Sequence, residues 1–386
     1  MIAHFISQSV RDYVSTHAPL VSGRGQLRED QVHLDAAIGW LMRSIDACDG
    51  KASSKGYRFL RGWMPPYPET SGYIIPTLLR LWQITGDESY KDRALSIGRW
   101  LVSIQLEDGG FVGRELGVLE KPVVFNTGMI LLGLASLIRN TGDKSFVGPA
   151  RRAADFLESC MDDDGCFVRN LSNDIVHTYN VRTAWALASF GRAMRESRYR
   201  SAALANARWA LGQQLDNGFF LNNTFKPGGN ANTHGLAYVL RGLFEINQLT
   251  GDRLLLDAVK RSADSVVTLY GIHGRIAGDI GPKWEYLSSH VCLTGYAQLA
   301  IVLFKLFSRT GEERYLNTAL SLLDDVAREQ NLGRPSAPYY GAIKGSMPIY
   351  GRYAMLQYPN WATKFFIDAL IEKRKTWVRY ADRVSV

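Results

Sequence analysis

The chain has 386 residues, 46% of them hydrophobic and 21% charged, so it carries enough apolar side chains for a folded core. Its 36 glycines follow no three-residue period and its cysteines number 4, which excludes collagen-like chains and disulfide scaffolds. The net charge of +8 suits an anionic partner. Because the sequence has no Lys/Arg-rich run and no zinc-finger motif, an acidic polysaccharide is favoured over nucleic acid.

The sequence also shows no membrane or export signal. No stretch of about 18 uncharged apolar residues occurs, so we expect no membrane-spanning helix. Residues 1–22 contain charged side chains and lack an apolar segment, which predicts no secretory signal and a cytoplasmic location. The cysteines do not have zinc-ligand spacing, so we expect structural thiols, no metal and no cofactor. The oligomeric state stays open.

A short Thr-Gly-acid motif recurs along the chain and decides the predicted fold. It occurs at residues 85–87, 141–143, 250–252 and 310–312, with spacings of 56, 109 and 60 residues. A degenerate copy at 196–199 fills the double gap, so the period is about 55 residues. Glycine after a helix suits a left-handed cap, and the acid that follows can cap the next helix. The motif therefore predicts a short turn within a helical hairpin.

Apolar periodicity places a helix on each side of these turns. The first helices are predicted near 72–84, 126–139, 178–194, 234–248, 291–308 and 359–374. The second helices are predicted near 90–105, 145–160, 199–214, 253–269 and 313–329, and a helix near 29–47 pairs with the last first helix. Twelve helices in six hairpins predict an all-α (α/α)6 toroid, a single domain over residues 1–386. Its N-terminal helix is expected to close against the C-terminal helix.

Long loops join one hairpin to the next and locate the expected site. They span 48–72, 105–126, 160–178, 214–233, 269–291 and 329–358, whereas connections within hairpins take about 4–6 residues. All six loops lead into the starts of first helices, where partial positive charge favours anions. The acidic run 162–164 stands where other repeats have Asp-Gly turns, so we interpret it as a structural turn.

Aromatic, amide and charged side chains gather in these loops and helix starts. This is the mixture a sugar site needs, because aromatic faces stack on sugar rings and polar groups bind hydroxyls. The candidates are Trp63, Tyr67, Glu69, Tyr73, Asn126, His177, Tyr179, Asn180, Arg182, His234, Tyr238, Trp284, Glu285, Tyr286, His290, Asn360 and Trp361.

One loop resembles a known family. Residues 282–290, Pro-Lys-Trp-Glu-Tyr-Leu-Ser-Ser-His, resemble the Arg-Trp-Asp-Tyr-x-Thr-Thr-His stretch of heparan-type glucuronyl C5-epimerases, and residues 232–243 are similar to a helix of that family. The resemblance implies a catalytic role for Tyr286 and places a second catalytic tyrosine near Tyr270. Where the family has Glu-Glu-Tyr, this chain has Leu-Asn-Asn at 221–223, which shifts the acid–base role toward His234 or Glu69.

The whole chain also resembles helical-toroid proteins encoded with bacterial exopolysaccharide genes and, more distantly, unsaturated-glucuronyl hydrolases and lyases. The resulting hypothesis is proton abstraction at C5 of a uronate, by an epimerase or a lyase. Tyr286 and His234 are its acid–base candidates. Arg182 and Asn180 would hold the carboxylate.

Aromatic side chains would hold the sugar rings in this hypothesis, and they are Trp63, Tyr73, Trp284 and Trp361. Two alternatives stay open. A glycoside hydrolase would use paired carboxylates among Glu69, Glu285 and Asp279. A polysaccharide-binding scaffold without catalysis is the other.

Overall fold

The computed structural model describes residues 25–118 and 121–384, and within them it contains twelve α-helices and a few short strands. The all-α class predicted from the sequence is confirmed. These residues form two compact units. The larger unit comprises residues 45–55 and 65–287, and the smaller comprises residues 25–44, 56–64 and 288–384. The prediction of a single domain stays a prediction.

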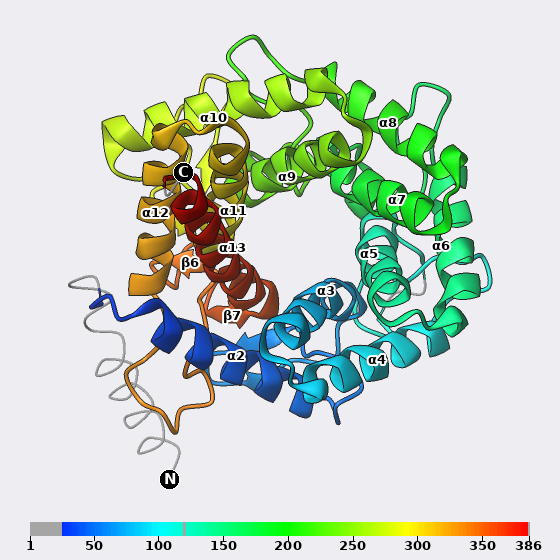
Figure 1. Cartoon of the computed structure of the whole chain (residues 1–386), viewed down its shortest axis with the longest axis horizontal. Helices are drawn as coiled ribbons and strands as arrows, with labels where there is room; N and C mark the ends of the chain where they lie inside the picture. The colour runs from blue at the N-terminus through cyan, green and yellow to red at the C-terminus, as the bar shows by residue number, and fades with distance from the viewer. Residues whose placement is uncertain (1–24, 119–120, 385–386) are drawn as a thin grey trace. The chain divides into compact units, whose positions relative to one another are not determined.

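The larger unit consists of four successive helical hairpins. They are α3 (Pro68–Thr85) with α4 (Glu88–Ser103), α5 (Val124–Thr141) with α6 (Val147–Ser159), α7 (Val181–Met194) with α8 (Ser197–Leu211), and α9 (Thr233–Thr250) with α10 (Arg253–His273). Within this unit, α3, α5, α7 and α9 pack side by side in that order, and α4, α6, α8 and α10 cover the other side of this layer (Figure 1). The predicted helix positions agree with these bounds to within a few residues.

The Thr-Gly-acid motifs form the predicted turns. Gly86 has φ 73° and caps α3, and the Asp87 carboxylate accepts a hydrogen bond from the backbone N–H of Ser89 at 2.9 Å. The threonine has a role too, because the Thr85 hydroxyl donates to the carbonyl of Leu81 at 2.8 Å and accepts from the N–H of Asp87 at 3.2 Å. Where the motif is degenerate, Arg195 takes the left-handed conformation with φ 59°.

Glycines allow the first helices to approach closely. A Cβ added to Gly72 of α3 would lie 2.6 Å from the Cα of Ile130 in α5, and one added to Gly133 of α5 would lie 2.3 Å from the Gly72 carbonyl oxygen. Larger side chains at these two positions would push α3 and α5 apart. The spacing of the layer, and hence the spacing of the side chains at its ends, depends on these contacts.

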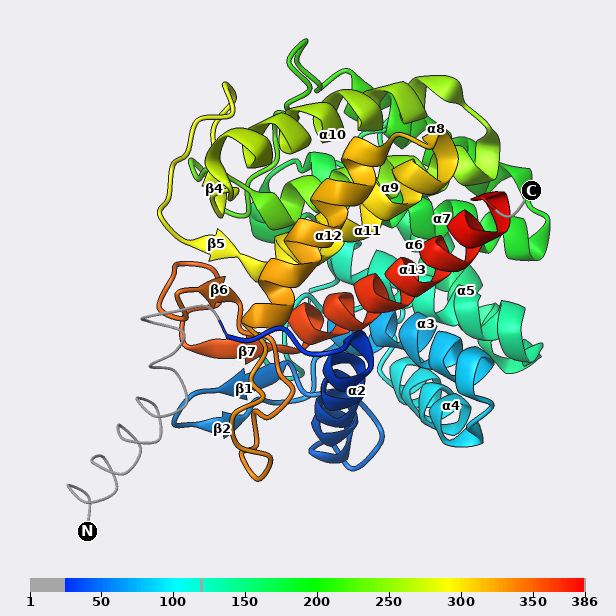
Figure 2. The same cartoon turned by 60° about the vertical axis from the view of Figure 1, so that its left-hand side comes forward.

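The smaller unit holds most of α2 (Asp30–Asp46), the hairpin of α11 (Leu293–Thr310) and α12 (Glu313–Arg328), and α13 (Asn360–Val384) (Figure 2). The predicted pairing of the N-terminal and last helices is seen in two contacts. The rings of His33 and Phe366 lie 6.1 Å apart, and Lys373 forms an ion pair with Asp30 at 2.8 Å.

Short antiparallel strands accompany the helices. In the smaller unit, β1 (Gly56–Arg58) lies between β2 (Gly62–Trp63) and β7 (Gln357–Pro359), and β5 (Val291–Cys292) pairs with β6 (Ser346–Met347). In the larger unit, β3 (Ala231–Asn232) pairs with β4 (Asp279–Ile280). The β3–β4 pair holds the chain at the start of α9.

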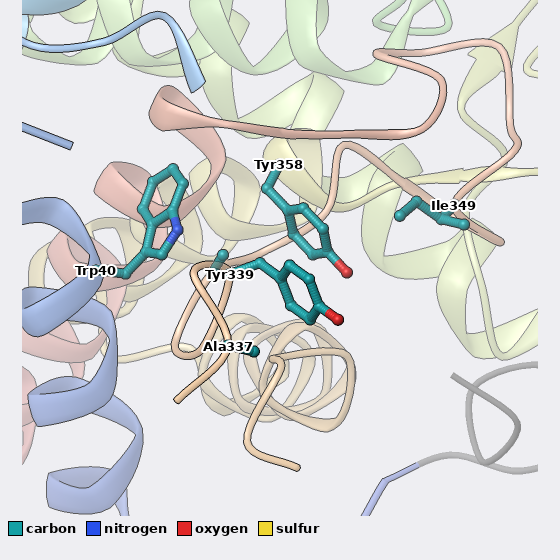
Figure 3. Packing of buried hydrophobic residues seen from close by; sticks show 6 residues of the cluster. Trp40, Ala337, Tyr339, Ile349 and Tyr358 are labelled. Carbon is teal, nitrogen blue, oxygen red and sulfur yellow. The ribbon is translucent and has the colours of Figure 1, made fainter. Parts of the chain in front are cut away.

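An aromatic cluster fills part of the smaller unit's core. Tyr339 and Tyr358 stack with ring centroids 5.3 Å apart, and their side chains lie parallel in Figure 3. The indole of Trp40 is fully buried in the same cluster. Among the described residues, no helix is both long and apolar enough to cross a membrane.

Candidate functional site

Four polar side chains lie at the starts of the first helices of the larger unit. Glu69 and Arg182 are the second residues of α3 and α7, Asn126 is the third residue of α5, and His234 is the second residue of α9. Because these helices run side by side, their starts lie at one end of the layer. The charge of Arg182 acts on both Glu69 and His234. The candidate site consists of Tyr67, Glu69, Asn126, Tyr179, Arg182, His234 and Tyr238.

Glu69 is poised between its two protonation states at neutral pH. Burial raises the pKa of its carboxyl group to about 7, although the hydrogen bond from Tyr67 and the charges of Lys55 and Arg182 oppose the rise. The Tyr67 hydroxyl donates to Glu69 Oε2 at 3.1 Å. A carboxyl group with a pKa near 7 can both donate and accept a proton under physiological conditions, as general acid–base catalysis requires.

A half-buried ion pair supports this carboxyl group. Lys55 Nζ lies 2.8 Å from Glu115 Oε1 and 4.6 Å from the centroid of the Tyr67 ring. Burial would raise the pKa of Glu115, but the hydrogen bond and charge of Lys55 hold it below its ordinary value. The neighbourhood of Tyr67 therefore contains one carboxyl group that readily holds a proton, Glu69, and one that is ionised, Glu115.

Asn126 lies beside the Tyr67 hydroxyl. Burial and the charge of Glu69 raise the pKa of Tyr67, and the Asn126 amide acts in the opposite direction. The Nδ2 atom of Asn126 is buried and has no hydrogen-bond partner among residues 25–118 and 121–384. In the same part of the chain, Asn180 Oδ1 at the start of α7 is also buried without a partner. Such atoms are suited to bind a ligand hydroxyl group.

Arg182 is a buried cation with aromatic neighbours. Its side chain is 2% exposed, and its Cζ atom lies 4.7 Å from the ring centroid of Tyr238 and 5.4 Å from that of Trp185. Its Nε atom donates to the sulfur of Met129 at 3.3 Å. A buried guanidinium is suited to bind a carboxylate, because it offers parallel N–H donors in a setting of low dielectric.

His234 is neutral at physiological pH. Burial and the charge of Arg182 hold the pKa of its imidazole well below the ordinary value. The ring lies 4.2 Å from that of Tyr238, and the backbone N–H of His234 donates to the capping Asn232 side chain at 2.9 Å. A neutral imidazole can accept a proton, so His234 and Glu69 can act as acceptor and donor on either side of Arg182.

Aromatic rings from three segments pack around this end of the layer. His177 and Tyr179 stack at 4.3 Å, and Phe125 lies 5.2 Å from Tyr179 and 5.1 Å from Tyr238. The His177 Nε2 atom lies 2.8 Å from the Ser172 carbonyl oxygen, which fixes the ring. Burial raises the pKa of the Tyr179 hydroxyl, so it stays protonated and can donate a hydrogen bond.

The tyrosines implied by the epimerase resemblance lie near the C-terminal end of α10. Tyr286 donates a hydrogen bond to the Arg275 carbonyl, and its ring lies 4.9 Å from that of His273. Burial raises its pKa, although the charge of Arg275 opposes the rise. Tyr270 lies within α10, where its carbonyl accepts the capping hydrogen bond from Gly274. The structure does not show contacts between Tyr286 and the residues of the candidate site.

Trp284 and Glu285 hold a tight turn in the larger unit. The indole N–H of Trp284 donates to the Asn217 carbonyl at 3.0 Å, and its ring lies edge-on to Phe219 at 5.6 Å. Glu285 Oε2 accepts from the backbone N–H of Lys283 at 2.7 Å. These contacts account for both side chains as packing and capping groups of the loop.

Five further candidates lie in helix or loop cores. Tyr73 is fully buried within α3 of the larger unit, and the other four belong to the smaller unit. Trp63 packs on Trp40 at 5.3 Å. The Asn360 side chain donates to the Ser44 hydroxyl at 2.7 Å, Trp361 Nε1 donates to the Tyr353 hydroxyl at 2.7 Å, and His290 is buried.

Sequence reasoning missed several residues that contact the candidate site. Lys55 and Glu115 lie 60 positions apart in two different loops, and no local pattern connects them. Trp185 is one helical turn after Arg182 and could have been found from that spacing. Phe125 precedes Asn126 directly, and Phe225 lies 5.7 Å from His234. Among the described residues, no group of three His, Cys, Asp or Glu side chains could hold a metal ion.

Solved structures of sugar-processing enzymes share this fold. Unsaturated glucuronyl hydrolase from a Bacillus species has a TM-score of 0.70 and 17% sequence identity, with 89% of this chain and 96% of that chain covered. D-mannose isomerase has a TM-score of 0.72 and 14% identity, covering 90% and 97%. Cellobiose 2-epimerase from Bacillus thermoamylovorans has a TM-score of 0.72 and 12% identity, covering 90% and 98%.

At these identities the likeness concerns the fold alone. No protein-family model and no curated protein sequence matches the chain. The structural neighbours are (α/α)6 toroids, and the fold predicted from the repeats is therefore confirmed.

Proposed function

We propose that this chain is a carbohydrate-active enzyme that removes the C5 proton of a uronate in an acidic polysaccharide or oligosaccharide. The observation that carries the proposal is the placement of buried Arg182 between a proton acceptor and a proton donor. His234 is neutral, and Glu69 has a pKa of about 7. The solved neighbours include a hydrolase named for unsaturated glucuronyl groups and two sugar isomerases or epimerases, which supports a sugar substrate.

The proposed reaction needs each of these three groups. Arg182 binds the substrate carboxylate and stabilises the negative charge that spreads into it when the C5–H bond breaks. Neutral His234 accepts that proton. Protonated Glu69 then returns a proton to the opposite face of C5, which gives the epimer, or protonates the O4 leaving group as the C4–O4 bond breaks, which gives the unsaturated lyase product.

The remaining polar and aromatic groups of the candidate site would bind the sugar. The unpartnered amide atoms of Asn126 and Asn180 are suited to substrate hydroxyl groups. The rings of Tyr179 and Tyr238 supply faces for sugar C–H groups. The resemblance to C5-epimerases assigns the base role to Tyr286 instead, so Tyr286 and His234 are rival candidates for one role.

A hydrolase is the second candidate, and one observation favours it. Glycoside hydrolysis uses one protonated and one ionised carboxyl group. Glu69 and Glu115 have pKa values that the structure moves in opposite directions, and both act on Tyr67. In this reaction Glu69 would protonate the leaving oxygen. Glu285, the other sequence candidate, is exposed and caps its own loop.

Incubation with uronate-containing polysaccharides in deuterated water distinguishes these reactions. Deuterium at C5 without new chain ends identifies an epimerase, absorbance near 232 nm identifies a lyase, and new reducing ends without that absorbance identify a hydrolase. Binding without turnover would support the scaffold alternative and overturn the enzyme proposal. We expect deuterium incorporation or the 232 nm product.

Matched variants then separate the rival residues. We expect His234→Gln and Glu69→Gln to lower kcat at least about 100-fold with helicity retained, since acid–base groups contribute about 10²–10⁴-fold. Tyr286→Phe is expected to keep most activity, because its hydroxyl is bonded to the Arg275 carbonyl. If Tyr286→Phe abolishes turnover and His234→Gln does not, the base role belongs to Tyr286. Glu285→Gln serves as the control among the carboxylates.

A further inference from the structure

A cluster of arginines lies at the opposite end of the first helices from the candidate site. Arg80 is on α3, Arg139 on α5, Arg192 on α7 and Arg241 on α9, so each of four neighbouring helices contributes one. The proposed reaction uses none of them. Arg139 and Arg192 are exposed, and Arg80 is half-buried.

Helix register places these side chains at two adjacent levels. Arg139 and Arg192 each stand three residues before the left-handed caps that end their helices, Gly142 and Arg195. Arg80 stands six residues before the cap Gly86. Because a helix rises 1.5 Å per residue, three residues separate the two levels by about 4.5 Å.

Direct contacts support this placement. The side chains of Gln83 in α3 and Asn140 in α5 share a hydrogen bond of 2.7 Å, so the ends of α3 and α5 lie together. Burial lowers the pKa of Arg139, and the charges of Arg192 and Arg80 lower it further while that of Glu245 opposes them. The three arginines are therefore neighbours in space.

The cluster is short of negative charge. Glu245 of α9 is already paired with Arg241, whose Nε atom lies 2.7 Å from Glu245 Oε1. Among the described residues, Arg139 and Arg192 form no ion pair. The turn carboxylates at this end have partners of their own, since Asp87 and Asp143 cap backbone N–H groups, Asp252 does the same, and Glu196 pairs with Arg151.

We propose that Arg80, Arg139 and Arg192 form a binding site for an oxyanion ligand, carrying a phosphate, sulfate or carboxylate group. A guanidinium presents two parallel N–H donors that match the oxygens of such groups, and three of them converge from three helices. A bound oxyanion would also remove the repulsion among the arginines. This site is separate from the candidate site and does not depend on the proposed reaction.

Isothermal titration of the purified full chain with inorganic phosphate, inorganic sulfate and D-glucuronate tests the proposal, with chloride holding the ionic strength constant. We expect at least one of the three to bind, and the double change Arg139→Gln with Arg192→Gln to weaken that binding at least tenfold. A tetrahedral anion as the preferred probe identifies a phosphorylated or sulfated ligand, whereas glucuronate identifies a carboxylate ligand.

The control is the double change Arg200→Ala with Arg208→Ala, which removes two exposed arginines from α8. It should leave the affinity unchanged. Far-UV circular dichroism checks that the cluster variant is folded, and the milder change Arg139→Lys with Arg192→Lys keeps the charge while removing the paired donors. The proposal is overturned if none of the three anions binds, if the Gln variant binds as the wild type does, or if the α8 control loses binding equally. Because Glu69→Gln is expected to bind the anion normally, failure here is distinct from failure of the proposed reaction.

Discussion

Replacing Glu69 with glutamine should stabilise the protein at alkaline pH while it abolishes the proposed activity. The pKa of this carboxyl group is about 7 in the folded protein against an ordinary value of 4.5. Below pH 4.5 both the folded and unfolded chains hold the proton, so it has no effect on stability. Between pH 4.5 and 7 the unfolded chain releases the proton that the folded chain keeps, and stability falls as pH rises.

The size of this loss follows from the same two values. The difference between about 7 and 4.5 corresponds to about 3 kcal/mol, an upper bound because Glu69 is partly exposed and water screens its charge. Glutamine is neutral and can still accept the Tyr67 hydrogen bond, so Glu69→Gln should recover up to about 3 kcal/mol at pH 8.5 and almost nothing at pH 4.

Urea denaturation of both proteins at pH 4 and pH 8.5 measures the difference. Glu107→Gln, on an exposed turn, is the matched control and should change stability little at either pH. The reasoning fails if Glu69→Gln is no more stable than the wild type at pH 8.5, or if its effect is the same at both values. Either result would mean that Glu69 ionises normally and is not held in its acid form by burial.

Three further changes test the environment of the site and the packing. Lys55→Met removes a charge that favours ionised Glu69, so carbon NMR titration should show the Glu69 pKa rising above its value in the wild type, and an unchanged titration would contradict the assigned role of Lys55. Trp284→Ala should cost about 3–5 kcal/mol of unfolding free energy in chemical denaturation because a buried indole is lost; a cost below about 1 kcal/mol would show that it does not pack the loop. Lys344→Met should cost about 3–5 kcal/mol, since it strands buried Glu329, whereas the double change with Glu329→Leu should recover most of the loss in a double-mutant cycle.

The repeating turns were predictable because their physics is local. A glycine in the left-handed region and an acid that caps the next helix need only neighbouring residues, so Gly86, Asp87 and their repeats reveal the hairpins without tertiary information. The regular spacing then predicted the toroid. The helix starts that carry Glu69, Arg182 and His234 followed from the same count, since each lies at a fixed position relative to its turn.

The electrostatic character of the site could be decided only in three dimensions. Nothing local to Glu69 indicates a pKa of about 7, because that value comes from burial by other segments and from Lys55 and Arg182. The aromatic residues are a similar case, since Trp284 has the composition of a sugar platform but fills a loop core against Phe219.

The sequence by itself therefore determined the helices, the turns and the end of the layer at which polar side chains gather. The tertiary structure decided which of those side chains meet, as in the contact of Lys55 with Glu115 across 60 residues. It also decided the grouping of Arg80, Arg139 and Arg192 at the other end, because the packing order of α3, α5 and α7 sets it. Helix and turn formation depends on neighbours in sequence, whereas charge and burial depend on neighbours in space.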